Sequence, residues 1–239
     1  MKFLCLVAKK KNFFNEIMSI EKYKTYSNEW ETIKHTCDDR SHYTVCSFLG
    51  NVYVIGGRLG IILNSCFKFD PSNYSWTEVA EINMPRYFAS RAVFEGRIVV
   101  SGGLVNNNHT TTKTVEAFEY IANSWEYMPS MIVPRFEHKL LAIKNKLFVI
   151  AGTDSPSCEM YDSTCKNFVL LPASPKISKQ FLSKICEVVS IKNKLAVFTS
   201  KRNIVLLNDV DSNEWSESEE LCEVTENILG FSCLKVPQF

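Results

Sequence analysis

Large aromatic residues recur along this chain at nearly constant intervals. Trp30, Trp76 and Trp125 are separated by 46 and 49 residues. Trp215 follows 90 residues after Trp125, and Phe168 lies near the middle of that longer gap. Self-similarity at a period of about 20–50 residues is typical of architectures built from one repeated supersecondary unit. The spacing therefore predicts five successive units of about 48 residues each.

Two further sequence features recur with the same period as these aromatics. Three β-rich runs, VYVIGG, IVVSGG and LFVIAG, end at Gly57, Gly103 and Gly152. Each run follows an arginine-led segment of constant length, and these segments begin at Arg40, Arg86 and Arg135. Because three independent marks share one register, a random scatter of core aromatics does not explain the pattern.

Each unit is expected to contain four short strands. An apolar segment, a turn such as 49–51 and the glycine-ended run are typical of a β-hairpin. A third strand carries an aromatic, and a fourth begins at the tryptophan, as in CFKFD followed by SWTEVA. Four short strands in about 48 residues are the signature of a propeller blade, so the predicted fold class is all-β.

With these marks the sequence resembles the kelch repeat family, and more narrowly the kelch domain of BTB-kelch proteins. The marks are the doublets Gly56–Gly57 and Gly102–Gly103, the third-strand aromatics and the tryptophans; the third-strand aromatics are Phe69, Tyr120 and Tyr161. The fourth strand often ends in Met-Pro in that family, as it does at 84–85 here. The resemblance implies a kelch-type β-propeller, and no segment of this sequence resembles a BTB or BACK region.

The repeat frame predicts five units within one propeller domain. Their approximate bounds are 1–34 together with 228–236, 42–86, 87–135, 136–178 and 181–226. The N-terminal piece carries three strands, and the apolar segment 228–236 would supply the missing one, closing the ring without a free edge. The resemblance implies six blades as the usual number, so a six-bladed ring truncated at its N-terminus is the alternative to a closed five-bladed ring.

Charge and motifs exclude several functional classes. Lys plus Arg number 27 against 26 Asp plus Glu, which argues against nucleic-acid binding. No stretch approaches the roughly 18 apolar residues of a membrane span. The nine cysteines form no CxxC pair, which favours reduced thiols in a cytoplasmic protein over zinc ligands. No catalytic or nucleotide-binding motif occurs, so we expect no enzyme activity, no metal and no cofactor.

The resemblance implies a binding face built from the loops that enter the first strand and leave the second strand of each blade. Carried over residue by residue, this face comprises Arg40, Ser41, Arg58, Arg86, Tyr87, Asn106, His109, Arg135, Phe136, Asp154 and Lys184. Three arginines in register would form a ring of cations suited to an acidic peptide, because the planar guanidinium binds carboxylates through two parallel hydrogen bonds. In the alternative, each arginine caps a strand end or pairs with a neighbouring glutamate.

By resemblance, the expected function is protein–protein interaction. The chain would be the substrate-recognition part of a BTB-kelch-like adaptor of a cullin-type E3 ubiquitin ligase, recruiting a cullin only if a BTB region is supplied elsewhere. An actin- or cytoskeleton-binding kelch module is the alternative. A kelch-fold oxidase is less favoured, because the four histidines show no ligand spacing.

Overall fold

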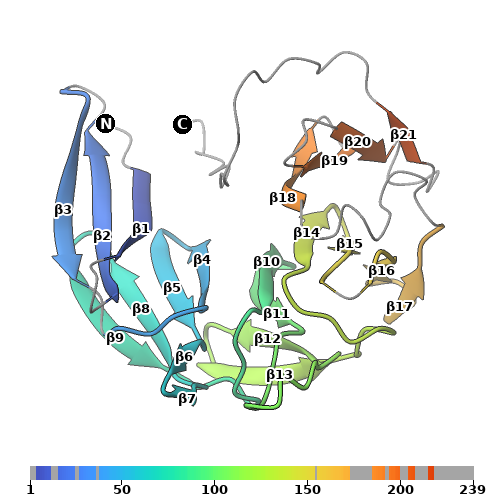
Figure 1. The fold of residues 1–239 in the computed structure, drawn as a ribbon, viewed down its shortest axis with the longest axis horizontal. Helices are drawn as coiled ribbons and strands as arrows, with labels where there is room; N and C mark the ends of the chain where they lie inside the picture. Colours follow the sequence, from blue (N-terminus) through green and yellow to red (C-terminus); the bar gives the residue numbers. More distant parts are fainter. Residues whose placement is uncertain are drawn as a thin grey trace.

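The structure is a computed structural model that describes residues 4–11, 16–24, 27–35, 38–153, 155–172, 185–191, 194–199, 204–207 and 215–217. Apart from one two-stranded hairpin, the strands in these segments form five antiparallel sheets that follow one another around an arc (Figure 1). No helix in the described part of the chain is long and apolar enough to cross a membrane. This arrangement confirms the predicted all-β propeller class.

We number the five sheets as blades 1 to 5 in chain order. Blade 1 has three strands: β1 (Leu4–Lys11), β2 (Glu16–Lys24) and β3 (Glu29–His35). Blade 2 has four: β4 (Thr44–Phe48), β5 (Asn51–Ile55), β8 (Cys66–Asp70) and β9 (Ser75–Val79). A small hairpin connects β5 to β8, and its strands are β6 (Arg58–Leu59) and β7 (Ile61–Ile62).

Blades 3 to 5 repeat the four-stranded meander. Blade 3 comprises β10 (Ser90–Phe94), β11 (Arg97–Ser101), β12 (Val115–Glu119) and β13 (Ser124–Met128). Blade 4 comprises β14 (Lys139–Ile143), β15 (Lys146–Ile150), β16 (Cys158–Asp162) and β17 (Asn167–Leu170). Blade 5 comprises β18 (Ile185–Ile191), β19 (Lys194–Thr199), β20 (Ile204–Leu207) and β21 (Trp215–Glu217).

The first strand of each four-stranded blade lies on the inside of the arc. Strands β4, β10, β14 and β18 contact one another in succession, whereas the fourth strands lie at the periphery (Figure 1). Blade 1 holds the three strands predicted for it. The predicted closing strand 228–236 lies outside the described residues, so the choice between a closed and a truncated ring stays a prediction.

Two-residue turns join the first two strands of blades 2 and 3. In blade 2, Leu49 and Gly50 have φ of 48° and 75° and separate the paired residues Phe48 and Asn51. Positive φ at both central residues is the type I′ geometry, whose twist matches that of the flanking strands. The turn predicted from the sequence is therefore confirmed, and it sets the register of the two innermost strands.

The core lies between neighbouring blades. Trp125 of blade 3 is only 8% exposed, packs on Phe118 with ring centroids 5.2 Å apart, and donates a hydrogen bond from Nε1 to the Ala80 carbonyl of blade 2 at 2.9 Å. Similar clusters join blades 3 and 4 through Phe94 and Phe168. Because each sheet face is covered by the next sheet, the apolar side chains leave water without a separate layer of helices.

Two aromatic positions depart from the repeat pattern. Trp30 has the same place in the repeat as Trp125 but is 52% exposed, because no sheet precedes blade 1 in the described residues. In blade 3 the aromatic that faces the tryptophan across the strands is Phe118, whereas the predicted Tyr120 lies exposed at the end of the sheet.

Candidate functional site

The three repeat arginines lie inside the protein. Arg40, Arg86 and Arg135 are each 1% exposed. Each donates from Nη1 to a carbonyl at the end of its blade's second strand; the acceptors are Gly56 at 2.8 Å, Gly102 at 2.9 Å and Ala151 at 2.6 Å. The arginines therefore cap strand ends, since these carbonyls lie beyond the sheet ladder and need donors.

Glutamates on the third strands provide the counter-charges in blades 3 and 4. Arg86 pairs with Glu116 on β12, and Arg135 pairs with Glu159 on β16 at 2.6 Å. Glu159 also accepts hydrogen bonds from the backbone N–H groups of Ile132 at 2.6 Å and Val133 at 2.9 Å. Each pair thus fastens the segment that crosses from one blade to the next.

In blade 2 the charge of the buried arginine is also compensated by a carboxylate, but this carboxylate does not lie on the third strand. Phe67 occupies the strand position of Glu116, and the Arg40 guanidinium lies over its ring at 4.9 Å from the centroid. The negative charge comes instead from Asp38, which is 2.6 Å from Nη2 of Arg40. Although partial burial raises the pKa of Asp38, the hydrogen bonds and charge of Arg40 outweigh it and hold that pKa below its ordinary value.

The prediction that these arginines present a ring of cations to a partner is therefore wrong, and the alternative of strand caps paired with carboxylates is confirmed. A buried charge is costly unless it is paired and hydrogen-bonded. Among the described residues, Nε of Arg135 is the one nitrogen of the three guanidinium groups that is buried without a hydrogen-bond partner. The other guanidinium N–H groups are already used by carbonyl and carboxylate oxygens of the protein itself.

The remaining predicted residues form a surface that we call the loop face. Ser41 and Arg58 exchange two backbone hydrogen bonds of 2.8 Å, which anchor the β6–β7 hairpin to the entering segment of blade 2. Gly60 turns the hairpin with φ of 69°. On either side of it, Leu59 is 47% exposed and Ile61 is 68% exposed. The hairpin therefore projects an apolar tip into solvent.

A second loop of the loop face is held by a buried tyrosine. The hydroxyl of Tyr87, itself 2% exposed, is 2.8 Å from Nδ1 of His109. The Arg58 guanidinium lies 5.8 Å from the centroid of the Tyr87 ring. Asn106 closes the loop on itself by accepting from the Thr110 N–H at 2.9 Å. Tyr87 is thus an internal support, while Asn106 and His109 are exposed.

Of the three other predicted residues, the structure describes only Phe136. Phe136 is half-buried, with its ring 6.3 Å from that of Phe88. Asp154 and Lys184 lie outside the described residues. The loop face therefore consists, as far as the structure describes it, of Ser41, Arg58, Leu59, Ile61, Asn106, His109 and Phe136.

The predicted binding face leaves out one position in each entering segment. Two residues after each arginine stand His42, Phe88 and Glu137, with φ of 54°, 55° and 53°. The Phe88 N–H donates to the His42 carbonyl at 3.0 Å, and the Glu137 N–H donates to the Phe88 carbonyl at 3.1 Å. These bonds link three blades around the inside of the arc. The constant offset from the arginines was the available sequence signal.

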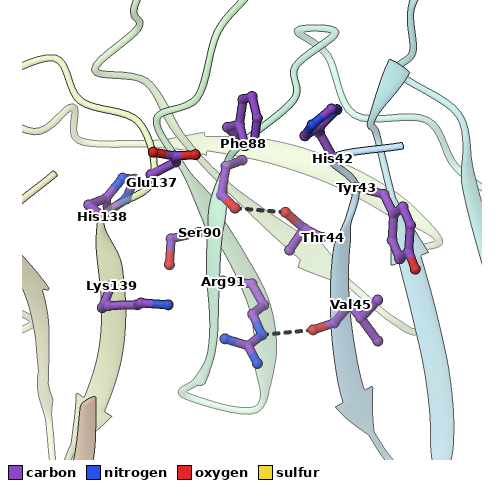
Figure 2. A pocket seen from close by; sticks show the side chains of 11 residues that line it. His42, Tyr43, Thr44, Val45, Phe88, Ser90, Arg91, Glu137, His138 and Lys139 are labelled. Carbon is purple, nitrogen blue, oxygen red and sulfur yellow. Dashed lines mark hydrogen bonds between the residues drawn. The ribbon is translucent and has the colours of Figure 1, made fainter. Parts of the chain in front are cut away.

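A cavity of about 470 Å³ opens between these three segments. Figure 2 shows its wall, built from the starts of the innermost strands β4, β10 and β14 and the residues before them. Its lining residues are His42, Tyr43, Thr44, Val45, Phe88, Ala89, Ser90, Arg91, Glu137, His138 and Lys139. Both hydroxyl and cationic side chains therefore reach this space.

Burial shifts the pKa of several titratable groups in blades 2 to 4. Nε2 of His138 is 2.7 Å from the Ser101 hydroxyl, and burial lowers the pKa of His138 to about 3. Burial likewise raises the pKa of Cys46 and Cys158 to about 11. At neutral pH the imidazole is uncharged and the thiols stay protonated. In the part of the chain that the structure describes, no three His, Cys, Asp or Glu side chains are grouped to hold a metal.

Comparison with known proteins agrees with this architecture. The sequence model of the Kelch motif matches residues 39–83 and 85–132. An F-box/kelch-repeat protein of Arabidopsis thaliana is 24% identical over 84% of this chain and 54% of its own length. Kelch-like protein 41a of Danio rerio is 30% identical over 46% of this chain and 18% of its own length. The chain thus matches about half or less of these relatives.

A solved structure supports the fold independently. The structure of YjhT superposes with a TM-score of 0.71 over 86% of this chain and 78% of that chain, at 15% sequence identity. At that identity the likeness concerns the fold alone. Together with the four-stranded blades, it shows that this chain folds as a β-propeller; the propeller carries two kelch motifs, at residues 39–83 and 85–132, and resembles the kelch domains of kelch-like proteins.

Proposed function

We propose that this chain is a protein-interaction module whose partner binds across the loop face. The observation that carries the proposal is the exposed apolar tip of the β6–β7 hairpin, where Leu59 and Ile61 stand beside Arg58, whose guanidinium lies 5.8 Å from the centroid of the Tyr87 ring. Exposed apolar side chains rimmed by polar groups are typical of protein-binding sites, and arginine and aromatic residues often carry much of the binding energy.

The base of the loop face is ordered before any partner arrives. Arg40 ties the end of β5 to the entering segment, and backbone hydrogen bonds join Ser41 to Arg58. Because these loops need little further ordering, binding would lose less conformational entropy than it would with mobile loops. The buried arginines thus support recognition by positioning the loops.

The finer proposal concerns the cellular role. Similarity to kelch-like proteins and to a protein named F-box/kelch-repeat supports a role as the substrate-recognition part of a cullin-type ubiquitin ligase adaptor. That role requires a BTB region, on this polypeptide or on a partner. The proposed location is the cytoplasm, which agrees with the four free cysteines among the described residues.

Affinity capture with matched variants tests the proposal. We expect Leu59→Ser with Ile61→Ser to reduce the captured partner at least tenfold, since about 1–3 kcal/mol is lost for each desolvated apolar anchor. Ile121→Ser is the control: Ile121 is 92% exposed, in the turn between β12 and β13, at the opposite end of the sheets. Equal capture by the folded double variant and the wild type would refute the loop face as the binding site.

The same hairpin variant also tests the alternative that the chain binds actin. Actin filaments are added to the purified chain at physiological salt and pelleted. Cosedimentation that the hairpin variant abolishes would assign the loop face to actin. Cosedimentation that the hairpin variant leaves intact would place actin elsewhere on the molecule and would count against the loop face as its site.

A further inference from the structure

The contact between blades 3 and 4 includes a buried histidine at a position where blades 2 and 3 have no basic residue. His138 is 3% exposed and directly precedes β14. The corresponding residues are Tyr43 before β4 and Ala89 before β10, and neither of them gains a proton between about pH 3 and 7. Figure 2 shows His138 on the wall of the cavity, at the start of β14. This junction therefore contains a group that can titrate in acid.

The His138 ring joins the two blades through its contacts with the end of β11. Its Nε2 lies 2.7 Å from the hydroxyl oxygen of Ser101, the last residue of β11. A Cβ atom added to Gly102 would lie 2.7 Å from Cε1 of the ring, so the imidazole packs directly on the backbone of blade 3. His138 is thus part of the junction that holds blade 4 on blade 3.

The junction accommodates the neutral imidazole better than the protonated one. A neutral ring carries a single N–H, which the Ser101 oxygen can accept from Nε2. A protonated ring carries a second N–H on Nδ1, and Nδ1 is buried without a hydrogen-bond partner among the described residues. A buried, charged donor without an acceptor is strongly unfavourable. Protonation is therefore expected to separate the two segments.

The charges around His138 act in the same direction. Three cations disfavour a positive charge on the ring, and they are Arg86, Arg135 and Lys139. The contacts from β11 and from the segment after β15 are uncharged; they come from Ser101, Gly102 and Gly152. The neighbouring carboxylates are already engaged, since Glu116 and Glu159 pair with arginines and Glu137 accepts from Thr153. Burial, followed by the cations, lowers the pKa of His138 to about 3.

We propose that His138 is an acid-sensitive latch between blades 3 and 4, closed while the imidazole is neutral and released when it gains a proton. Release would deform the cavity between the entering segments, because His138 forms part of its wall. The inference is independent of the loop face and of any partner that binds there, so it can fail or succeed without the proposed function.

The direction of the pH dependence follows from the lowered pKa. Because the pKa of His138 in the folded protein lies below its ordinary value, the unfolded chain binds more protons, and stability is lost as the pH falls. The loss begins near pH 6.5 and continues toward about pH 3. Between these limits, His138 alone should raise the equilibrium constant for unfolding about tenfold for each pH unit.

Urea denaturation of the purified chain, followed by circular dichroism at several pH values, tests the latch. His138→Gln keeps an amide beside Ser101 but cannot titrate. Between about pH 7.5 and 4.5 we expect the equilibrium constant for unfolding to rise on the order of a hundredfold more in the wild type than in this variant. If the glutamine variant does not fold, His138→Ala, which introduces the residue that blade 3 has at this position, must show the same flattened profile.

Ser101→Ala is the matched control. It removes the hydrogen-bond partner of Nε2 but leaves the titrating ring in place. We expect it to be less stable than the wild type at every pH and to keep the wild-type pH dependence. Parallel pH profiles for the wild type and His138→Gln would refute the latch, and so would a flattened profile for Ser101→Ala.

Amide hydrogen exchange tests whether the effect is confined to this junction. The Glu137 N–H donates to the Phe88 carbonyl and links blades 3 and 4, whereas the Phe88 N–H donates to the His42 carbonyl and links blades 2 and 3. On acidification from about pH 7 to 5, corrected for intrinsic exchange, the wild type should lose at least tenfold more protection at Glu137 than at Phe88. His138→Gln should abolish this difference. Equal losses at both amides in the wild type would overturn a latch at the blade 3–4 junction.

Discussion

At the scale of single residues, an arginine that recurs once per blade can either bind a ligand at the surface or stabilise the fold from inside. The residues around each arginine determine which of the two roles it has. Glu116 and Glu159 turn Arg86 and Arg135 inward, while Asp38 does so for Arg40. Each carboxylate lies either on the third strand of the arginine's own blade or, for Asp38, in the segment that enters the blade. Charge that is fully compensated inside the fold is unavailable to a partner.

The first prediction concerns the Arg135–Glu159 pair, whose two side chains are fully buried. Glu159→Gln keeps the size of the side chain but leaves the Arg135 charge uncompensated. We expect the free energy of unfolding to fall by about 3–5 kcal/mol, as when one partner of a buried ion pair is removed. Chemical denaturation followed by circular dichroism measures it.

The matched control is an exposed pair on the same propeller. Glu95 lies 3.7 Å from Arg97, and both are partly exposed. Glu95→Gln should cost less than about 1 kcal/mol, because solvent screens the interaction. If the two substitutions cost the same, Glu159 would not be the compensating charge that we infer.

At the scale of elements, the second strands of blades 2 and 3 each end against the entering segment of the next blade. The Gly57 N–H donates to the Arg86 carbonyl and the Gly103 N–H to the Arg135 carbonyl, both at 2.9 Å. The preceding residue, Gly56 or Gly102, has φ near 58° and approaches the same carbonyl oxygen too closely for a Cβ atom. The glycine doublet is thus a point of contact between blades.

The second prediction follows from that close approach. A Cβ at Gly102 would overlap the Arg135 carbonyl oxygen, which is backbone and has little room to move. Gly96 has φ of 71° but open space around its Cβ position. Gly96→Ala should therefore cost only the left-handed backbone penalty of about 1–2 kcal/mol. Gly102→Ala should lower the melting temperature by clearly more, and equal shifts for both would contradict the contact.

At the scale of the whole molecule, each described blade is stabilised by the next. Trp125 joins blade 3 to blade 2, and the cluster around Phe148 and Val197 joins blade 4 to blade 5. In such an arrangement the stability is approximately a sum of blade terms and nearest-neighbour interface terms. A substitution between two blades therefore weakens the arc as a whole.

The third prediction compares two tryptophans at the same place in the repeat. Trp125→Ala opens a cavity between blades and leaves the Ala80 carbonyl without its donor, so we expect a loss of about 3–5 kcal/mol of unfolding free energy. Trp30→Ala should cost much less, because half of that side chain already faces solvent. Equal losses in urea denaturation would show that Trp30 is also an interface residue.

Much of the fold was predictable because each blade is a local structure. Strands that follow one another pair with one another, so the alternation of apolar runs, turns and aromatics over about 48 residues specifies the meander. The type I′ turn at Leu49–Gly50 follows from residues adjacent in sequence. The exposure of Trp30 was not predictable in this way, because it depends on whether another sheet lies against it.

The candidate site was predictable only in part. The loops named by the resemblance do lie before the first strands and after the second strands of blades 2 and 3, yet the resemblance did not tell which of their side chains point outward. Arg86 and Glu116 are 30 residues apart, and their pairing depends on the twist and stacking of the sheet. Ser101 and His138 are likewise brought together from different blades.

The sequence by itself determined the repeat, the number of visible units and the order of strands within each blade, because these depend on interactions between consecutive segments. The tertiary structure decided which side chains carry a charge inside the protein. Packing buried Arg40, Arg86 and Arg135 against carboxylates, and it buried His138 beside cations, so that the imidazole stays uncharged at neutral pH. The physical reason is that burying a charge is costly unless a counter-charge accompanies it, and only the stacking of blades brings such groups within reach.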